Sequence, residues 1–189
     1  EPIVPEMQLP GGTAIRFVFP HAPMRPVTVN NGMVMRAWYD VVISDGRRQE
    51  DEPGVRESDR QIRALIARER ERGVPASAIF LFGFSQGGAM ALSTGVRYEE
   101  RLGGIAALSC FLPLADKIAA EATAVNRDVP IFMAHGSQDP LIPMARARHA
   151  HDLLSSLGYR LEWHEYPIPH SVSPAVIRDI SAWLQRILA

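Results

Sequence analysis

One serine stands in the kind of turn that exposes a hydroxyl for attack on a carbonyl group. Ser85 lies in a G-x-S-x-G pattern, after the apolar stretch 79–82 and before a run rich in Ala, Met and Leu. A strand that feeds a helix through a tight, glycine-flanked turn is typical of a nucleophile elbow, although an ordinary strand–helix turn is the alternative. We expect a side chain at Gly83 or Gly87 to crowd the turn, and the backbone N–H of Gln86 to face an oxyanion.

An aspartate and a histidine that follow later predicted strands can complete this chemistry. Asp139 comes after the apolar run 129–134, and His170 comes after the run 160–166. Because ligands of open α/β sheets bind beyond the carboxyl ends of the strands, we expect Ser85 and these two residues at one edge. The serine needs a base, the imidazole can take its proton, and the carboxylate would hold the imidazole tautomer. The alternatives are a plain Asp-Pro turn and a packing or solvated histidine.

The other histidines and the glycines do not indicate a metal or cofactor site. His149 and His151 share a predicted helix at a spacing that points the two rings apart. The sequence has no H-E-x-x-H or Cys–His cluster, and no glycine pattern typical of a dinucleotide or P-loop site. We therefore expect chemistry that needs neither a metal nor a cofactor.

Strands alternate with helices along most of the chain. The apolar runs 79–82, 105–108 and 129–134 predict buried strands, and the alternating run 160–166 predicts a strand near the sheet edge. Helices are predicted after Ser58, after Ser85, over 144–157 and from Pro174 onward, where Ser173 is the cap. This order predicts a mostly parallel sheet with helices on both faces, and the sequence Ser, Asp, His is that of an α/β-hydrolase fold.

Fewer helices and strands can be predicted in the N-terminal region. Residues 15–19 are β-rich and stop at a proline, so we expect a strand there, and we expect 21–31 to be irregular around an Asn-Asn-Gly turn. Residues 38–43 form a further candidate extended piece. Residues 44–57 are charged and carry Gly and Pro, which predicts a surface loop or, alternatively, a flap over the site.

The helix that follows this loop has its own predicted start. Ser58 with Gln61 three residues later forms a capping-box pattern, and Ile62, Leu65 and Ile66 give the apolar stripe of a helix. Its other face alternates acids with bases, which indicates a solvated surface and no nucleic-acid patch.

Length and composition bound the class of protein. With 189 residues we expect a single domain, residues 1–189, and the net charge of −1 gives no electrostatic reason to expect nucleic acid as a partner. Cys110 is the only cysteine, so no intrachain disulfide is possible. No apolar run approaches the roughly 18 residues that span a membrane, so we expect no stable membrane insertion.

Several short motifs lie along nearly the whole chain. They are Phe17-Val18-Phe19-Pro20-His21-Ala22-Pro23, Pro26-Val27-Thr28, Asn31-Gly32, Met35 with Ala37-Trp38-Tyr39-Asp40, Gly83-Phe84-Ser85-Gln86-Gly87-Gly88, Leu108-Ser109-Cys110-Phe111-Leu112-Pro113, His135-Gly136 with Asp139-Pro140, and His170. Together these motifs resemble the carboxylesterase/phospholipase family, which includes acyl-protein thioesterases and short bacterial carboxylesterases.

The resemblance implies roles for particular residues. It implies that Ser85, Asp139 and His170 form a catalytic triad and that Gln86 supplies one oxyanion N–H. It also implies substrate-binding positions at Trp38, Leu112 and Met35, no cofactor, a cytoplasmic location and, in some members, a homodimer.

The sequence departs from the family in two places. Members carry an upstream strand and an H-G-x-G-type loop that supplies a second oxyanion donor, and this chain begins just after the place where that loop would end. We therefore expect the N-terminal strand or strands of the fold to be missing here, so that the domain is N-terminally incomplete. Pro169 stands where the family commonly has Gly, and its fixed φ predicts a modest shift of His170.

These observations predict a serine carboxylesterase that hydrolyses short- to medium-chain acyl esters through an acyl-enzyme. One alternative is an acyl-protein thioesterase or lysophospholipase that acts on long acyl chains and needs a long apolar groove. Such a groove could be lined by apolar residues that otherwise belong to the core, namely Met24, Met33, Val34, Met35 and Phe111. An alternative from another class is a binding module that keeps the fold without catalysis.

Overall fold

A parallel sheet of four strands forms the centre of the computed structural model, which describes residues 3–7, 9, 14–44 and 47–188. The strands, in their order across the sheet, are β5 (Phe80–Phe84), β6 (Gly104–Leu108), β7 (Ile131–Gly136) and β8 (Leu161–Tyr166). Each pairing is parallel, so the carboxyl ends of the strands meet at one edge. The strands predicted from the apolar runs are confirmed, including the edge position of β8.

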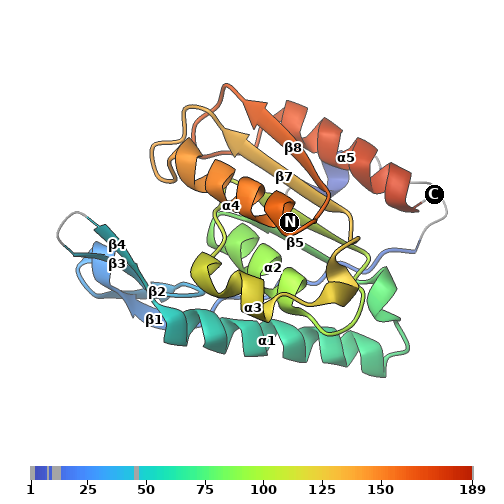
Figure 1. The fold of residues 1–189 in the computed structure, drawn as a ribbon, viewed down its shortest axis with the longest axis horizontal. Helices are drawn as coiled ribbons and strands as arrows, with labels where there is room; N and C mark the ends of the chain where they lie inside the picture. The colour runs from blue at the N-terminus through green and yellow to red at the C-terminus, as the bar shows by residue number, and fades with distance from the viewer. Residues whose placement is uncertain (1–2, 8, 10–13, 45–46, 189) are drawn as a thin grey trace.

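Helices cover both faces of this sheet (Figure 1). The α-helices are α1 (Glu52–Glu71), α2 (Gln86–Arg97), α3 (Ile118–Glu121), α4 (Met144–Ser156) and α5 (Pro174–Leu188). Short 3-10 helices span η1 (Val4–Glu6), η2 (Thr28–Asn30), η3 (Ala76–Ala78), η4 (Ala115–Lys117) and η5 (Ala124–Asn126). Helices α2 and α4 pack on one face, with α1 against α2, and α5 packs on the other.

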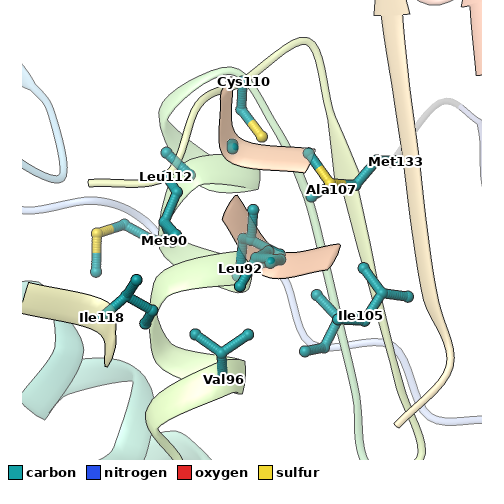
Figure 2. Packing of buried hydrophobic residues seen from close by; sticks show 14 of the residues in the cluster. Met90, Leu92, Val96, Ile105, Ala107, Cys110, Leu112, Ile118 and Met133 are labelled. Atoms are coloured by element: carbon teal, nitrogen blue, oxygen red, sulfur yellow. The ribbon is translucent and has the colours of Figure 1, made fainter. Parts of the chain in front are cut away.

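Alternate residues of β6 divide the core between the two faces. Ile105 and Ala107 belong to the cluster shared with α1, α2 and α4, whereas Ala106 and Leu108 belong to the cluster shared with α5. This alternation is the two-residue period of a strand that is buried on both sides. Figure 2 shows how side chains of α2, such as Leu92, reach toward β6 on the first of these faces.

Two antiparallel hairpins lie at one end of the molecule, at the left of Figure 1. The first pairs β1 (Met24–Val27) with β2 (Met33–Arg36), and the second pairs β3 (Val41–Ser44) with β4 (Arg47–Glu50). The prediction that 21–31 is irregular is therefore wrong for β1, which accepts Pro26 because it is an edge strand. The predicted Asn-Gly turn is confirmed, since Asn31 and Gly32 have φ of 56° and 74°.

The predicted strand at 15–19 is absent from the structure. Residues 14–20 have no strand assignment, because no other described segment pairs with them as a ladder. The rings of Phe17 and Phe19 stack with centroids 6.2 Å apart, which fits an extended backbone that places alternate residues on one side. A β-rich composition alone therefore does not produce a strand here.

Helix α1 starts six residues before its predicted cap. Its N-cap is Asp51, whose carboxylate accepts a hydrogen bond from the Gly54 N–H at 3.0 Å, and Pro53 lies in the first turn, where proline is favourable. Ser58 is instead buried inside the helix, so the capping-box prediction is wrong. The predicted loop 44–57 is likewise wrong, because β4 and the start of α1 occupy most of it.

Candidate active site

The nucleophile candidate sits at a strained turn between β5 and α2. Ser85 has φ of 55° and ψ of −124°, and its backbone N–H donates to the Leu108 carbonyl at 2.9 Å. Strain of this kind persists where the surrounding structure fixes the backbone. A Cβ on Gly83 would lie 2.1 Å from the Gly87 carbonyl carbon, whereas one on Gly87 would meet only the Trp38 indole nitrogen, at 4.0 Å. The prediction of crowding therefore holds for Gly83 and is wrong for Gly87.

Ser85, His170 and Asp139 form a continuous chain of hydrogen bonds. The Nε2 atom of His170 lies 2.9 Å from the Ser85 hydroxyl oxygen, and its Nδ1 atom lies 2.6 Å from Oδ2 of Asp139. The Asp139 side chain is 0% exposed and the His170 side chain is 12% exposed. The structure thus brings together, at the carboxyl edge of the sheet, three residues that are far apart in the sequence.

The environment of Asp139 keeps its carboxylate charged. Burial raises the pKa of this carboxyl, but the Ile142 N–H, the His170 imidazole and the Leu141 N–H stabilise the anion more strongly. Its pKa is therefore lowered from the usual value. Both backbone N–H groups donate to Oδ1, at 2.8 and 2.9 Å, which leaves Oδ2 for the imidazole.

The loop that carries His170 packs tightly against the end of β7. A Cβ on Gly136 would lie 2.3 Å from the Ile168 carbonyl oxygen, and the Gln138 N–H donates to the same oxygen at 3.1 Å. The Phe84 ring lies 4.6 Å from the imidazole centroid. With these contacts His170 reaches Ser85 even though Pro169 precedes it.

Both the main chain and the side chain of Gln86 take part in the structure of the candidate site. Its backbone N–H occupies the first position of α2, where a helical N–H has no acceptor within the helix. Its Oε1 accepts a hydrogen bond from the Trp38 N–H at 2.8 Å, and its Nε2 donates to the Tyr39 carbonyl at 3.0 Å. The side-chain contacts were not predicted from the sequence.

The three predicted substrate-binding residues lie in different settings. Trp38 has its indole nitrogen near Gly87, beside the nucleophile turn. Leu112 is buried in the core cluster that includes α2, as Figure 2 shows. Met35 lies in β2, where its sulfur accepts a hydrogen bond from the Asn30 amide at 3.0 Å. Of the three, Trp38 is the one that lies beside the nucleophile turn.

The Met-rich segment is largely outside the core. Met24, Met33 and Val34 are exposed by 58 to 65%, whereas Phe111 is buried. The alternative that this stretch belongs to the core is therefore wrong for Met24, Met33 and Val34, since a two-stranded hairpin has too few neighbours to cover both of its faces. That these residues line an apolar groove stays a prediction.

Sequence reasoning missed the part played by His135. Its Nε2 lies 2.9 Å from the Ile142 carbonyl oxygen and 3.7 Å from Oδ2 of Asp139, and its side chain is fully buried. Because a carbonyl can only accept, Nε2 carries the proton in this contact. The bond holds the turn whose N–H groups face the Asp139 carboxylate. The available signal was a histidine within an otherwise apolar strand.

Two negative findings apply to the residues that the structure describes. Among them no group of three or more His, Cys, Asp or Glu side chains is arranged to hold a metal ion. None of their helices is both long enough and apolar enough to cross a bilayer.

Comparisons with known proteins identify the family of this chain. The model of the Phospholipase/Carboxylesterase family matches residues 11–188. Acyl-protein thioesterase 1 of Gibberella zeae is 38% identical over 182 residues, which cover 92% of this chain and 77% of that protein. The protein of the same name from Neurospora crassa is 42% identical over 160 residues, covering 81% and 65%.

A solved structure gives the same result for the fold. A crystal structure of a SOBER1 variant from Arabidopsis thaliana superimposes with a TM-score of 0.92 at 32% identity, covering 100% of this chain and 92% of that one. The predicted α/β-hydrolase fold is therefore confirmed. The chain belongs to the phospholipase/carboxylesterase family, whose members are serine hydrolases of the carboxylesterase and thioesterase type.

Proposed function

We propose that Ser85, His170 and Asp139 are the catalytic triad of an acyl hydrolase. The observation that carries the proposal is the continuous hydrogen-bond chain from the Ser85 hydroxyl through His170 to Asp139. A serine hydroxyl is a weak nucleophile at its own pKa, and an adjacent base within about 3.2 Å is the usual means of activating it.

We assign a group of this site to each step of the proposed reaction. As the Ser85 oxygen attacks the acyl carbon, its proton moves to Nε2 of His170, and Asp139 stabilises the resulting imidazolium. The backbone N–H of Gln86 donates to the oxyanion. Collapse of the tetrahedral intermediate expels the alcohol or thiol, which takes the proton from His170, and leaves an acyl-enzyme. Water then releases the acid in the same way, with His170 again as the base.

The substrate we propose is a long-chain acyl thioester or ester, as for an acyl-protein thioesterase. The names of the curated relatives favour this class over the short- and medium-chain esters that were the first sequence-based prediction. Trp38, whose indole lies beside the nucleophile turn, is proposed to contact the acyl chain. The substrate-binding roles of Leu112, which is buried, and of Met35 stay predictions. A cytoplasmic location and a homodimer stay predictions.

A chain-length series tests the proposal. Hydrolysis of p-nitrophenyl esters and matched acyl thioesters, from acetyl to palmitoyl, is compared between the parent protein and Ser85→Ala. We expect turnover that is highest on long chains and falls on the order of 10⁶-fold in Ser85→Ala. A maximum of turnover on short acyl chains would favour the hypothesis of a short- to medium-chain carboxylesterase.

Covalent labelling separates a catalytic protein from a binding module. A fluorophosphonate reacts with an activated serine, so we expect labelling of the parent and none of Ser85→Ala. Folded parent protein that neither reacts nor turns over any ester would contradict the proposal and favour a binding module.

A further inference from the structure

The main chain at Trp38 is held by two side chains from different helices. The amide of Gln86, at the start of α2, accepts from the Trp38 N–H at 2.8 Å and donates to the Tyr39 carbonyl at 3.0 Å. The hydroxyl of Ser58, from the middle of α1, donates to the Trp38 carbonyl. These three hydrogen bonds hold the backbone of residues 38–39 in place, as the hydrogen bonds to a neighbouring strand hold a strand in a sheet.

Burial makes these bonds costly to lose. Ser58 is 0% exposed and Tyr39 is 4% exposed. A buried backbone group left without a partner destabilises its conformation by more than the bond itself contributes. The position of the Trp38 segment therefore depends on Gln86 and Ser58.

The same arrangement connects the segment with the reacting atoms. Gln86 directly follows Ser85, and its backbone N–H is the proposed oxyanion donor. The indole nitrogen of Trp38 lies 4.0 Å from the position of a Cβ on Gly87, one residue further along. One residue thus bears the proposed oxyanion donor and fixes the segment beside it.

We propose that Gln86 and Ser58 are positioning residues. Their side chains hold Trp38 in one orientation, so that its indole forms a fixed packing surface for the acyl chain. The inference rests on the proposed acyl-hydrolase function and extends it to selectivity. A fixed indole favours acyl chains that pack against it, whereas a mobile one discriminates less. The backbone N–H of Gln86 remains when the side chain is substituted, but the two bonds of that side chain also hold the residue that bears this N–H. We therefore expect loss of the side-chain amide to shift the oxyanion donor and to affect the chemical step as well as acyl binding.

The test compares Ser58→Ala with Ser181→Ala, a matched control in α5. Ser181 is also buried and donates to a backbone carbonyl, that of Ile177 at 2.7 Å, but it lies on the opposite face of the sheet. For the preferred ester we expect Ser58→Ala to raise KM about fivefold, the factor that corresponds to one net hydrogen bond, with kcat unchanged. Its chain-length profile flattens, and Ser181→Ala keeps the parent profile.

Gln86→Met, which keeps the length of the side chain without its amide, is expected to lower kcat on every ester and to flatten the profile. Gln86→Glu keeps the acceptor for the Trp38 N–H but places a second carboxylate oxygen opposite the Tyr39 carbonyl oxygen, where two acceptors repel each other, so we expect an effect at least as large as that of Gln86→Met. An unchanged profile in folded Ser58→Ala and Gln86→Met, or the same change in Ser181→Ala, would overturn the inference.

A readout without turnover keeps the inference testable if the proposed function fails. The fluorescence of Trp38 is obtained as the difference between each protein and its Trp38→Phe counterpart. We expect acrylamide to quench this component more strongly in Ser58→Ala than in the parent. Equal quenching contradicts the positioning role, whereas a parent without Ser85-dependent turnover contradicts only the proposed function and the acyl selectivity.

Discussion

Asp139 has one oxygen for the backbone and one for the imidazole. Its Oδ1 accepts two backbone N–H groups, and its Oδ2 faces Nδ1 of His170 at 2.6 Å. This division fixes the imidazole orientation, because the carboxylate cannot rotate without losing the backbone bonds. The role that we propose for Asp139 is therefore to select the tautomer in which Nε2 is free to accept the Ser85 proton.

Asp139→Asn tests this role at the level of one atom. An amide nitrogen at the position of Oδ2 would donate to Nδ1 and move the imidazole proton to Nε2, where it blocks the base. We expect kcat to fall on the order of 10⁴-fold, the size recorded for this change in a serine-protease triad. The measurement is steady-state ester hydrolysis, with circular dichroism as the check on folding. A fall of less than about tenfold would contradict the assigned role.

At this scale the sequence predicts the three polar residues but not all of their neighbours. Ser85, Asp139 and His170 could be found because each follows an apolar run and parallel strands end at a common edge. The contacts of the Gln86 side chain could not be found, since its partners are backbone groups 48 and 47 positions away. The partner of His135, the Ile142 carbonyl, is only seven positions away, but it depends on the path of the turn after β7, which the sequence pattern does not give. Which glycine is crowded depends on the direction of its Cβ, which spacing alone does not give.

Helices α1, α2 and α3 are joined by a partly buried group of charges. Arg97 of α2 donates to Glu121 of α3 at 2.7 Å and to the Leu114 carbonyl at 3.0 Å, and Arg56 of α1 also pairs with Glu121. Leu114 has φ of 52°, a conformation that needs support from its surroundings. The group therefore supports the chain between β6 and α3, which includes Leu112.

This group makes stability depend on pH. Hydrogen bonding with Arg56 lowers the pKa of Glu121, burial opposes it, and Arg97 lowers it further, so that the pKa falls from 4.5 to about 2. Because the folded-state pKa lies below the unfolded value, the stabilisation is complete above pH 4.5 and is lost as the pH falls toward about 2. We expect Glu121→Gln to have a lower Tm than the parent at neutral pH and a smaller decrease of Tm on acidification.

Glu99→Gln is the control, because Glu99 pairs with Arg63 but is 66% exposed, and exposed pairs contribute little. If Glu121→Gln has the same Tm and pH dependence as Glu99→Gln, the buried group does not contribute as described.

At the scale of elements, the buried strands can be predicted well, because each is an apolar run. The secondary structure of charged or Pro-containing segments is predicted poorly. The extended piece predicted at 38–43 is confirmed in part, since β3 covers 41–44, and the turn of the first hairpin is also predicted. The strands β1 and β4 are not, because Pro26 and the charges of 47–50 resemble loop sequence and each strand has a single partner. The start of α1 was missed because Pro53 and Gly54 suggest a loop, although Pro suits a first turn. The N–H of Gly54 donates to Asp51, and a Cβ on Gly54 would lie 2.0 Å from that carboxylate.

The whole sheet is needed to assemble the candidate site. Ser85 follows β5, Asp139 follows β7 and His170 follows β8. Ser85 and His170, which share a hydrogen bond, are 85 positions apart in the sequence. The alternation of strands and helices made this fold predictable. The division of the core into two faces depends on β6 being buried on both sides.

A core substitution far from the triad tests whether site and fold form one cooperative unit. Ile180 of α5 is fully buried on the face opposite α2, and Ile180→Val removes one methylene, with an expected loss of about 0.5–1.5 kcal/mol of unfolding free energy. Because the triad needs β5, β7 and β8 together, the urea midpoints of ellipticity and of fluorophosphonate labelling at Ser85 should fall by the same amount.

Val125→Ala, at an exposed position, should move neither midpoint. Labelling that is lost at a lower urea concentration than ellipticity would mean that the site opens before the sheet unfolds, and that the triad belongs to a separate, less stable unit.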